Sequence, residues 1–327
     1  MRQLVTADIG GTHARFAIAT IDRGQVVGID REAVFKTADF VSFERAWNAF
    51  EDRVGSKLPN DLSLAVAAPV AGDDFSLTNS HWQFRRAQIV SQLRLDSMLV
   101  INDFAAIAHA ISVVDEAQLL HVTGPSEPLP ASGVITIVGP GTGLGAALLI
   151  RGENGAHQVI ETEGGHVDFA PLDDLEDRIV AELRKKFGRV SAERLVSGPG
   201  LLNIYEMLGK LEGQPIVTQD EPALWALALE QKDQLAGIAL DRMCMCLGAV
   251  AGDLALAHGA CGVVIAGGIG RRLADRLGGS GFAKRFVAKG RFERRLAAVP
   301  VKLLTLPEPG LLGAAVAFAA QRLERVP

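Results

Sequence analysis

The chain is poor in cysteine, in long apolar runs and in basic residues, and each shortage excludes a class of protein. Of its three cysteines, Cys244 and Cys246 are separated by one residue, and no His or further Cys stands near them to complete a zinc site. We therefore expect these two and Cys261 to be reduced, buried thiols in a cytosolic protein. No apolar run reaches the ~18 residues that span a bilayer. The sequence begins with a strand pattern, so we expect no signal peptide.

The net charge of -5 argues against a nucleic-acid-binding protein, because phosphate backbones require a basic face. Residues 282–295 are locally basic, and we expect a solvated helix or loop there. Glycine, in contrast, is abundant, with 35 residues that gather in a few loops. A chain of 327 residues with ordinary globular composition forms two domains or one large one. The glycine-rich loops are the first candidates for functional sites.

Two glycine-rich hairpins are the most informative feature. Residues 4–20 form a pattern of strand, turn and strand, with the acid Asp8 before a Gly-Gly-Thr turn at 10–12. Residues 135–150 repeat this plan around Gly-Thr-Gly at 141–143. A Walker A loop or a dinucleotide fingerprint needs a helix after its glycines, so neither fits. Backbone N–H groups at such tips can grip phosphate, with glycines allowing close approach and φ > 0, and Asp8 can hold the accompanying cation.

A third glycine-rich turn and a polar strand end add further candidates. The turn at 266–270 follows a buried strand and leaves room for a ribose or a flat ring, although close strand–helix packing is an alternative. The predicted strand 98–101 ends in Asn102 and Asp103, at the strand edge where open α/β sheets bind ligands. Asp103 can accept a proton from a substrate hydroxyl, and Asn102 can hold a neighbouring hydroxyl. The alternative is that Asp103 only caps the helix that follows.

A loop rich in acid, glycine and histidine spans residues 161–171. Its Glu163 and His166 are candidates for a polyol site, because side chains that make paired hydrogen bonds recognise adjacent hydroxyls. Glu193 is a third candidate. It lies just inside a predicted helix start, in a segment, residues 190–200, that ends in a Gly-Pro-Gly turn at 198–200. The alternatives for His166 are a satisfied core histidine or a metal ligand, although no partner has suitable spacing.

The order of strands and helices predicts an α/β protein of two domains. We expect the final helix, at about 313–323, to cross back onto the N-terminal domain. The smaller domain then comprises residues 1–113 with 308–327, and the larger one residues 114–307. The two long apolar helices predicted within 222–256 offer a face for a homodimer.

Taken in order, these motifs resemble bacterial glucokinases of the type that lacks a zinc motif. The resemblance covers essentially the whole chain, whereas the first hairpin alone would indicate only the wider superfamily of sugar kinases, actin and heat-shock ATPases. One departure is His13, where the family usually has Asn. The matching segments are ADIGGT at 7–12, IND at 101–103, GPGTGLG at 139–145, EGGHVDFAP at 163–171, SAERLVSGPG at 191–200, AGGI at 266–269 and PGLLGA at 309–314.

The resemblance implies an ATP-dependent hexokinase of the ribonuclease-H-like, actin-like ATPase fold. Mixed sheets flanked by helices would form two domains, with glucose and ATP in a cleft between them. The reaction would carry the γ-phosphoryl of MgATP to the 6-hydroxyl of glucose, in the cytoplasm, as the entry to glycolysis. A kinase for another hexose or an amino sugar, a non-catalytic sugar- and ATP-binding regulator and an actin-like ATPase scaffold are the alternatives.

The resemblance also implies roles for individual residues. Asp103 would be the general base, and Asp8 would position Mg²⁺ through water. The glucose contacts would be Asn102, Asp103, Glu163, His166 and Glu193. The ATP contacts would be Ala7, Asp8, Ile9, Gly10, Gly11, Thr12, Gly141, Thr142, Gly143, Gly267 and Gly268.

Overall fold

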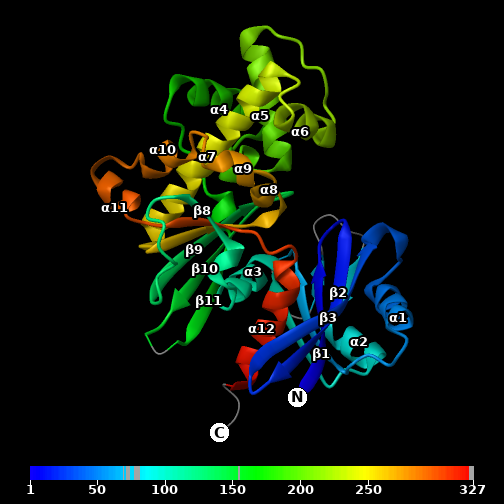
Figure 1. Ribbon diagram of the computed structural model, residues 1–327. Helices are drawn as coiled ribbons and strands as arrows, with labels where there is room; N and C mark the ends of the chain where they lie inside the picture. The colour runs from blue at the N-terminus through cyan, green and yellow to red at the C-terminus, as the bar shows by residue number, and fades with distance from the viewer. Residues whose placement is uncertain (69, 71–73, 77–81, 154, 324–327) are drawn as a thin grey trace. The chain divides into compact units, whose positions relative to one another are not determined.

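The computed structural model describes residues 1–68, 70, 74–76, 82–153 and 155–323. The chain divides into two compact units, each with its own sheet (Figure 1). Unit 1 comprises Met1–Val114 and Leu306–Pro327, and unit 2 comprises Asp115–Thr305. Unit 1 is discontinuous because the last helix returns to it. The predicted α/β class is confirmed, since the five-stranded and the six-stranded sheet both mix parallel and antiparallel strands and carry helices.

Unit 1 is built on a five-stranded sheet in the order β3-β2-β1-β4-β7. The first three strands form an antiparallel meander, and β4 and β7 run parallel to β1. The predicted opening hairpin is therefore the centre of this sheet. The elements of the unit are β1 (Arg2–Ile9), β2 (His13–Asp22), β3 (Gln25–Lys36), α1 (Phe43–Val54), β4 (Asp61–Val66), β5 (Asp74–Ser76), β6 (Gln83–Arg85), α2 (Arg86–Leu93), β7 (Ser97–Asn102), α3 (Asp103–Ile111) and α12 (Pro309–Leu323).

The two faces of this sheet are covered by different helices, because successive strand residues point to opposite sides. Phe16 of β2 stacks on Phe50 of α1, with ring centroids 5.4 Å apart. Leu4 of β1 belongs instead to a cluster with Phe318 of α12. The Thr6 hydroxyl also donates to the carbonyl of Leu311, at 2.7 Å, which fastens α12 to β1. The expected return of the final helix to the N-terminal sheet is confirmed.

Unit 2 is built on a six-stranded sheet in the order β11-β10-β9-β12-β13-β8. Strands β9, β10 and β11 are antiparallel, and β12 is parallel to both β9 and β13. The elements are β8 (Leu119–Thr123), β9 (Gly133–Pro140), β10 (Leu144–Arg151), β11 (His157–Thr162), α4 (Asp174–Phe187), α5 (Gly198–Glu212), α6 (Glu221–Leu229), α7 (Gln234–His258), β12 (Gly262–Ile265), α8 (Gly267–Arg272), α9 (Ala274–Leu277), α10 (Phe282–Val287), α11 (Glu293–Ala297) and β13 (Val301–Leu304).

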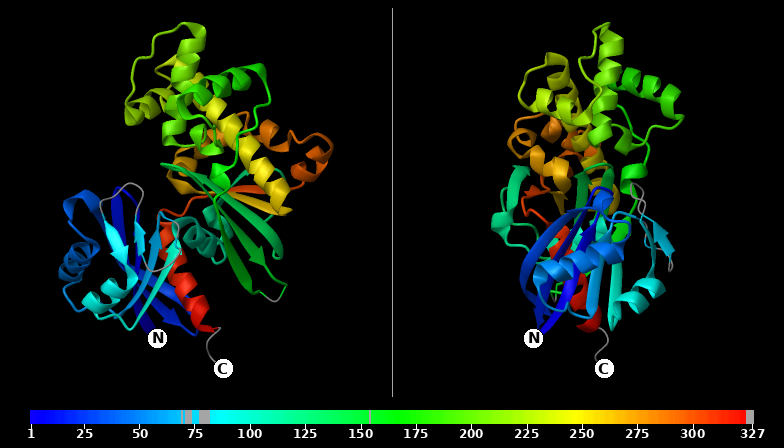
Figure 2. Two further views of the ribbon diagram at one scale, coloured as in Figure 1. Left: turned by 180° about the vertical axis from the view of Figure 1, so that it is seen from behind. Right: turned by 90° about the vertical axis from the view of Figure 1, so that its right-hand side faces the viewer.

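Helix α7 is the core helix of unit 2 and lies against its sheet (Figure 2). By length and mean hydropathy it could cross a bilayer, although Asp241, Arg242 and Asp253 interrupt its sequence, so its apolar residues form no unbroken run of about 18. However, 72% of its most apolar window is buried inside the protein. A homodimer face within residues 222–256 stays a prediction. Cys244 and Cys246 are buried here as predicted, whereas Cys261 is only half-buried.

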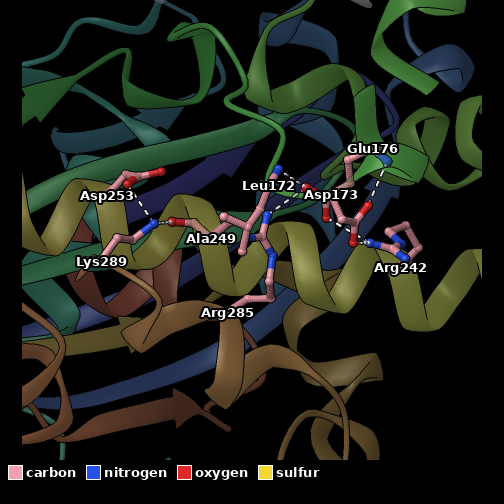
Figure 3. Close-up of polar contacts among 8 residues, drawn as sticks. All are labelled: Leu172, Asp173, Glu176, Arg242, Ala249, Asp253, Arg285 and Lys289. Carbon is pink, nitrogen blue, oxygen red and sulfur yellow. Dashed lines mark hydrogen bonds and ion pairs between the residues drawn. The ribbon is translucent and has the colours of Figure 1, made fainter. Parts of the chain in front are cut away.

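A buried ionic cluster joins α4, α7 and α10 (Figure 3). The carboxylate of Glu176 is fully buried and pairs with Arg285 at 2.7 Å and with Arg242 at 3.1 Å. The N–H of Leu172 donates to the same carboxylate at 2.8 Å. Arg285 is only 4% exposed, so the prediction that residues 282–295 form a solvated segment is wrong for this arginine, whereas Lys284 and residues 293–295 are exposed as predicted. The basic run supplies a core ion pair because α10 packs directly on α7.

Two predicted turns prove to be helix starts. Residues 198–200, predicted as a turn, form the first residues of α5, because Ser197 caps them and Pro199 favours the first helical turn. Residues 267–270, also predicted as a turn, open α8. In both cases the glycines mark the entrance to a helix, and the helix begins earlier than expected.

Candidate active site

The first glycine-rich tip joins β1 to β2. Its N–H at Gly10 donates to the carbonyl of His13 at 2.9 Å, which closes the turn. Thr37 holds the far side of the tip, because its hydroxyl donates to the carbonyl of Gly11 at 2.7 Å and its N–H to that of Thr12 at 3.0 Å. Neither Gly10 nor Gly11 has a positive φ, so that part of the expectation is wrong. The tip is fixed by hydrogen bonds rather than by left-handed backbone.

The second glycine-rich tip joins β9 to β10 and is held in a similar way. The N–H of Gly141 donates to the carbonyl of Gly143 at 2.8 Å, and the N–H of Gly198 donates to the carbonyl of Gly141 at 2.8 Å. The N–H of Leu144 donates to the Oε2 of Glu193 at 2.9 Å. The expected positive φ is again wrong for Gly141 and Gly143. This tip is thereby tied to the segment that carries a predicted sugar ligand.

The third glycine-rich segment combines close packing with an open position. Gly267 has a φ of 81°, and a Cβ there would lie 2.8 Å from the carbonyl oxygen of Pro140. Only glycine fits this approach of α8 to the end of β9. A Cβ at Gly268, in contrast, would meet nothing within 4 Å. Close strand–helix packing therefore explains the glycine at 267. The position of Gly268 is open, as the predicted binding of a ribose or a flat ring requires.

Asn102 and Asp103 lie where β7 passes into α3. The Oδ1 of Asn102 accepts from the N–H groups of Phe104 and Ala105, at 2.8 and 3.3 Å, so Asn102 is the N-cap. Asp103 is the first helical residue, and its Oδ1 accepts from Phe104 at 2.9 Å. Asn102, and not Asp103, is therefore the N-cap, although the Asp103 carboxylate also accepts a backbone N–H of the first turn. The cap fixes the backbone from which the Asp103 carboxylate projects.

Glu163, His166 and Glu193 come together in unit 2, although Glu193 stands 27 positions after His166 in the sequence. The Nε2 of His166 lies 4.0 Å from an oxygen of Glu163 and 4.0 Å from an oxygen of Glu193. The His166 side chain is 52% exposed, which excludes the core-histidine interpretation. Within the described ranges, no three His, Cys, Asp or Glu side chains form a group that could hold a metal ion. The loosely spaced acids and imidazole are suited to a polyhydroxyl ligand.

Short backbone contacts fix the loop that carries His166. The Nη1 of Arg189 donates at 2.7 Å to both the carbonyl of His166 and the carboxylate of Asp168. The N–H of Ala192 donates to the carbonyl of Val167 at 2.8 Å. Sequence reasoning missed Arg189, because nothing in its surroundings distinguishes it from an ordinary surface arginine. Arg189 holds the loop through the backbone carbonyl of His166 and the side chain of Asp168.

The surroundings of the Asp8 carboxylate shift its pKa. Burial raises the pKa of Asp8 to about 6, while Arg15, 3.8 Å away, works in the lowering direction and Glu308 works in the raising direction. Arg15 is itself paired with Glu308 at 2.6 Å. Sequence reasoning missed both partners of Asp8. Glu308 stands one residue before the matched motif at 309–314, and this position is the one feature of the sequence that could have indicated its role.

The predicted site residues divide between the two units. Unit 1 holds the first tip with Asp8, together with Asn102 and Asp103. Unit 2 holds the second tip, the sugar set around His166, and Gly267 with Gly268. Each unit thus holds one glycine-rich tip and one set of predicted polar site residues.

Comparisons with known proteins give a consistent family. A family model described as Glucokinase matches residues 5–321. The chain is 55% identical to the glucokinase of Zymomonas mobilis over 97% of its own length and 98% of that protein. It is 39% identical to the glucokinase of Marinobacter nauticus, with 96% of each chain covered.

Solved structures extend this likeness to three dimensions. A glucokinase from an Antarctic psychrotroph superposes with a TM-score of 0.83 at 36% identity, covering 97% of this chain and 98% of the other. A Balamuthia mandrillaris glucokinase, solved with glucose, gives a TM-score of 0.77 at 21% identity, covering 98% and 94%. The second likeness speaks for the fold alone. Together with sugar kinases of lower identity, these neighbours confirm the predicted actin-like ATPase fold.

Proposed function

The chain belongs to the glucokinase family, and we propose that it transfers the γ-phosphoryl of MgATP to the 6-hydroxyl of glucose. The observation that carries this proposal is the sugar set of unit 2, in which one imidazole lies 4.0 Å from two carboxylates. Adjacent sugar hydroxyls can donate to the carboxylates of Glu163 and Glu193 and accept from His166. The near-complete match to a curated glucokinase supports the same assignment.

Asp103 is proposed as the general base. A carboxylate at the start of α3 can accept the proton of the 6-hydroxyl as its oxygen attacks phosphorus. Asn102 fixes the first turn of that helix through its Oδ1. Its amide NH₂ donates to the carbonyl of Ala68 at 3.5 Å, and this group has a second N–H that suits a neighbouring sugar hydroxyl. The reaction then depends mainly on positioning, because phosphoryl transfer leaves little covalent chemistry to the protein.

The two glycine-rich tips are proposed to hold the phosphates, and α8 the nucleoside. Backbone N–H groups of residues 10–12 and 141–143 can approach phosphate oxygens closely. Asp8 suits Mg²⁺, because that ion is usually bound by one or two carboxylates together with substrate phosphates. A bound cation would also offset the cost of burying the Asp8 charge. When bound, Mg²⁺ supplies neutralisation of phosphate charge.

The decisive experiment is an assay for glucose 6-phosphate, coupled to its dehydrogenase, with a panel of glucose, mannose, fructose and N-acetylglucosamine. We expect the highest kcat/KM for glucose and no turnover without Mg²⁺. A higher kcat/KM for another sugar would make the chain a kinase for that sugar. Binding of glucose and ATP without turnover of any sugar would overturn the enzymatic role and favour a regulator.

The base role has its own test in Asp103→Asn. General-base catalysis contributes about 10²–10⁴-fold, so we expect kcat to fall by that factor while glucose affinity stays within about threefold. Near-normal turnover of this variant would show that Asp103 is not the base.

A cytoplasmic location, entry to glycolysis and a homodimer belong to the same proposal. The burial of α7 in unit 2 supports a soluble enzyme. Sedimentation velocity of the purified protein tests the dimer, and a single species at the mass of one chain would contradict it.

A further inference from the structure

One short segment of unit 2 contacts both the sugar loop and the second phosphate tip. At its beginning, the N–H of Ala192 donates to Val167 of the sugar loop at 2.8 Å. At its end, the N–H of Gly198 donates to Gly141 of the tip at 2.8 Å. Residues 192–198 therefore span the two proposed binding elements without a break.

Glu193 makes the side-chain contact within this segment. Its Oε2 accepts the N–H of Leu144 at 2.9 Å, and the same oxygen lies 4.0 Å from the Nε2 of His166. A Cβ at Gly143 would overlap with this oxygen. The side-chain position of Glu193 thus requires both the N–H that follows the tip and the absence of a side chain at residue 143.

We propose that Gly143 and the N–H of Leu144 position Glu193 for the sugar, so that the second phosphate tip sets sugar affinity even when no nucleotide is bound. The inference rests on the proposed function, since Glu193 is a sugar ligand there. A carboxylate has two oxygens with about four acceptor positions, so Glu193 can keep the Leu144 bond and still accept from sugar hydroxyls. Holding the side chain in one rotamer beforehand lowers the entropy lost when the sugar binds.

The coupling is reciprocal. If the tip strengthens sugar binding through Glu193, bound sugar must strengthen the arrangement of the tip by the same factor. Sugar would then prepare the tip for the phosphate donor within unit 2. Gly143 and Leu144 are positioning residues in this scheme, because they act on the sugar through Glu193.

Two glycines of the same tip provide a matched pair of variants. Neither Gly143 nor Gly141 has a positive φ, so alanine can adopt both backbone conformations. A Cβ at Gly141 would meet nothing within 4 Å, whereas one at Gly143 displaces the flexible end of Glu193. Both substitutions add one methyl group to the tip, but only Gly143→Ala disturbs the proposed contact.

The measurement is the Kd of sugar by titration calorimetry, without nucleotide or Mg²⁺. The sugar is the one that the unmodified enzyme phosphorylates best, so a different sugar preference revises the proposed function and leaves this test intact. We expect Gly143→Ala to raise the Kd about ten- to hundredfold, the usual effect of one hydrogen bond to a charged group. Gly141→Ala should change it less than twofold. Equal Kd values for the two variants would overturn the proposal.

A double-mutant cycle separates positioning from general damage to the fold. In a Glu193→Ala background the positioned group is gone, so Gly143→Ala should have no further effect on the sugar Kd. Full additivity of the two substitutions would refute the proposal. Thermal unfolding of each variant checks that the comparison concerns folded protein, and the Gly141→Ala control shows whether an added methyl group alone is harmful.

Discussion

Asp8 in unit 1 and Glu176 in unit 2 are both carboxylates inside the protein, but their surroundings differ. Glu176 is fully buried and faces two arginines, at 2.7 and 3.1 Å, as well as a backbone N–H at 2.8 Å. The Asp8 side chain is 19% exposed, and its nearest paired cation, Arg15 at 3.8 Å, makes a closer pair with Glu308.

We interpret the difference as one between a structural acid, Glu176, and the acid proposed to hold a cation, Asp8. The charge of Glu176 is satisfied within the protein, so this acid has little to offer a ligand. The charge of Asp8 is incompletely compensated, and the raised pKa of Asp8 is the consequence. A site that must receive a cation is less stable before the cation arrives, and the following substitutions test that interpretation.

The largest effect is expected from Glu176→Gln. Removing one partner of a buried ion pair leaves uncompensated charge, here on Arg285, since Arg242 keeps its pair with Asp173 at 2.5 Å, and typically costs about 3–5 kcal/mol. The free energy of unfolding, measured by denaturant titration, should fall by this amount. Lys185→Met is the control, because Lys185 is 69% exposed where it pairs with Glu182, and it should cost under about 1 kcal/mol. A similar loss in both variants would show that burial of the ion pair is not decisive.

Asp8→Asn should have the opposite sign. In the folded protein the pKa of Asp8 is raised from 3.8 to about 6, so ionised Asp8 destabilises the folded state by up to about 3 kcal/mol. At pH 7.5, without Mg²⁺ or nucleotide, the variant should be more stable than the original protein by this amount while losing activity. The gain should shrink to about half at pH 5 and vanish below about pH 3, where Asp8 is protonated in both the folded and the unfolded state.

Two results would contradict this expectation for Asp8. One is a variant less stable than the original protein at pH 7.5, and the other is a stability gain that does not change with pH. Asp30→Asn serves as the control, because the Asp30 side chain is 61% exposed and a lost surface charge should leave stability almost unchanged.

The strands and turns of the site could be predicted from sequence, whereas the partners of its charges could not. Period-two alternation and a glycine-rich turn are local properties, so the hairpin around residues 10–12 and its counterpart at 141–143 were foreseen. The bond between Leu144 and Glu193 joins residues 49 positions apart, and no local pattern encodes it.

Arg285 shows the same limit more strongly. Its local sequence is basic, which predicts a solvated face, yet it pairs with Glu176 across 109 positions. A charged side chain can be buried when a partner is buried with it, and that partner is set by the packing of α10 on α7. The two misjudged turns have a local cause instead, because glycine and proline also mark the first residues of helices.

A smaller effect is expected from Glu308→Gln, which makes Asp8 more like Glu176. The charge of Glu308 raises the pKa of Asp8 and holds Arg15, so its removal should let Arg15 pair with Asp8 and lower that pKa. We expect a change worth about 1 kcal/mol or less, measured by following the Asp8 carboxyl carbon by NMR during a pH titration. Glu32→Gln, at an exposed position of β3, should leave the titration in place. An unchanged pKa in Glu308→Gln would show that Arg15 does not redistribute.

The smallest effect is expected from Asp253→Asn, in the half-exposed pair at the edge of the ionic cluster (Figure 3). Lys289 is nearly buried and donates to the carbonyl of Ala249 at 2.9 Å as well as to Asp253 at 2.7 Å. Asp253 is 51% exposed, so its charge is screened by solvent and its loss should lower the free energy of unfolding by under about 1 kcal/mol. The distance to lysine equals the 2.7 Å of Glu176 to Arg285, so this pair isolates burial from geometry. A loss as large as that of Glu176→Gln would mean that contact distance, and not burial, distinguishes structural acids from functional ones.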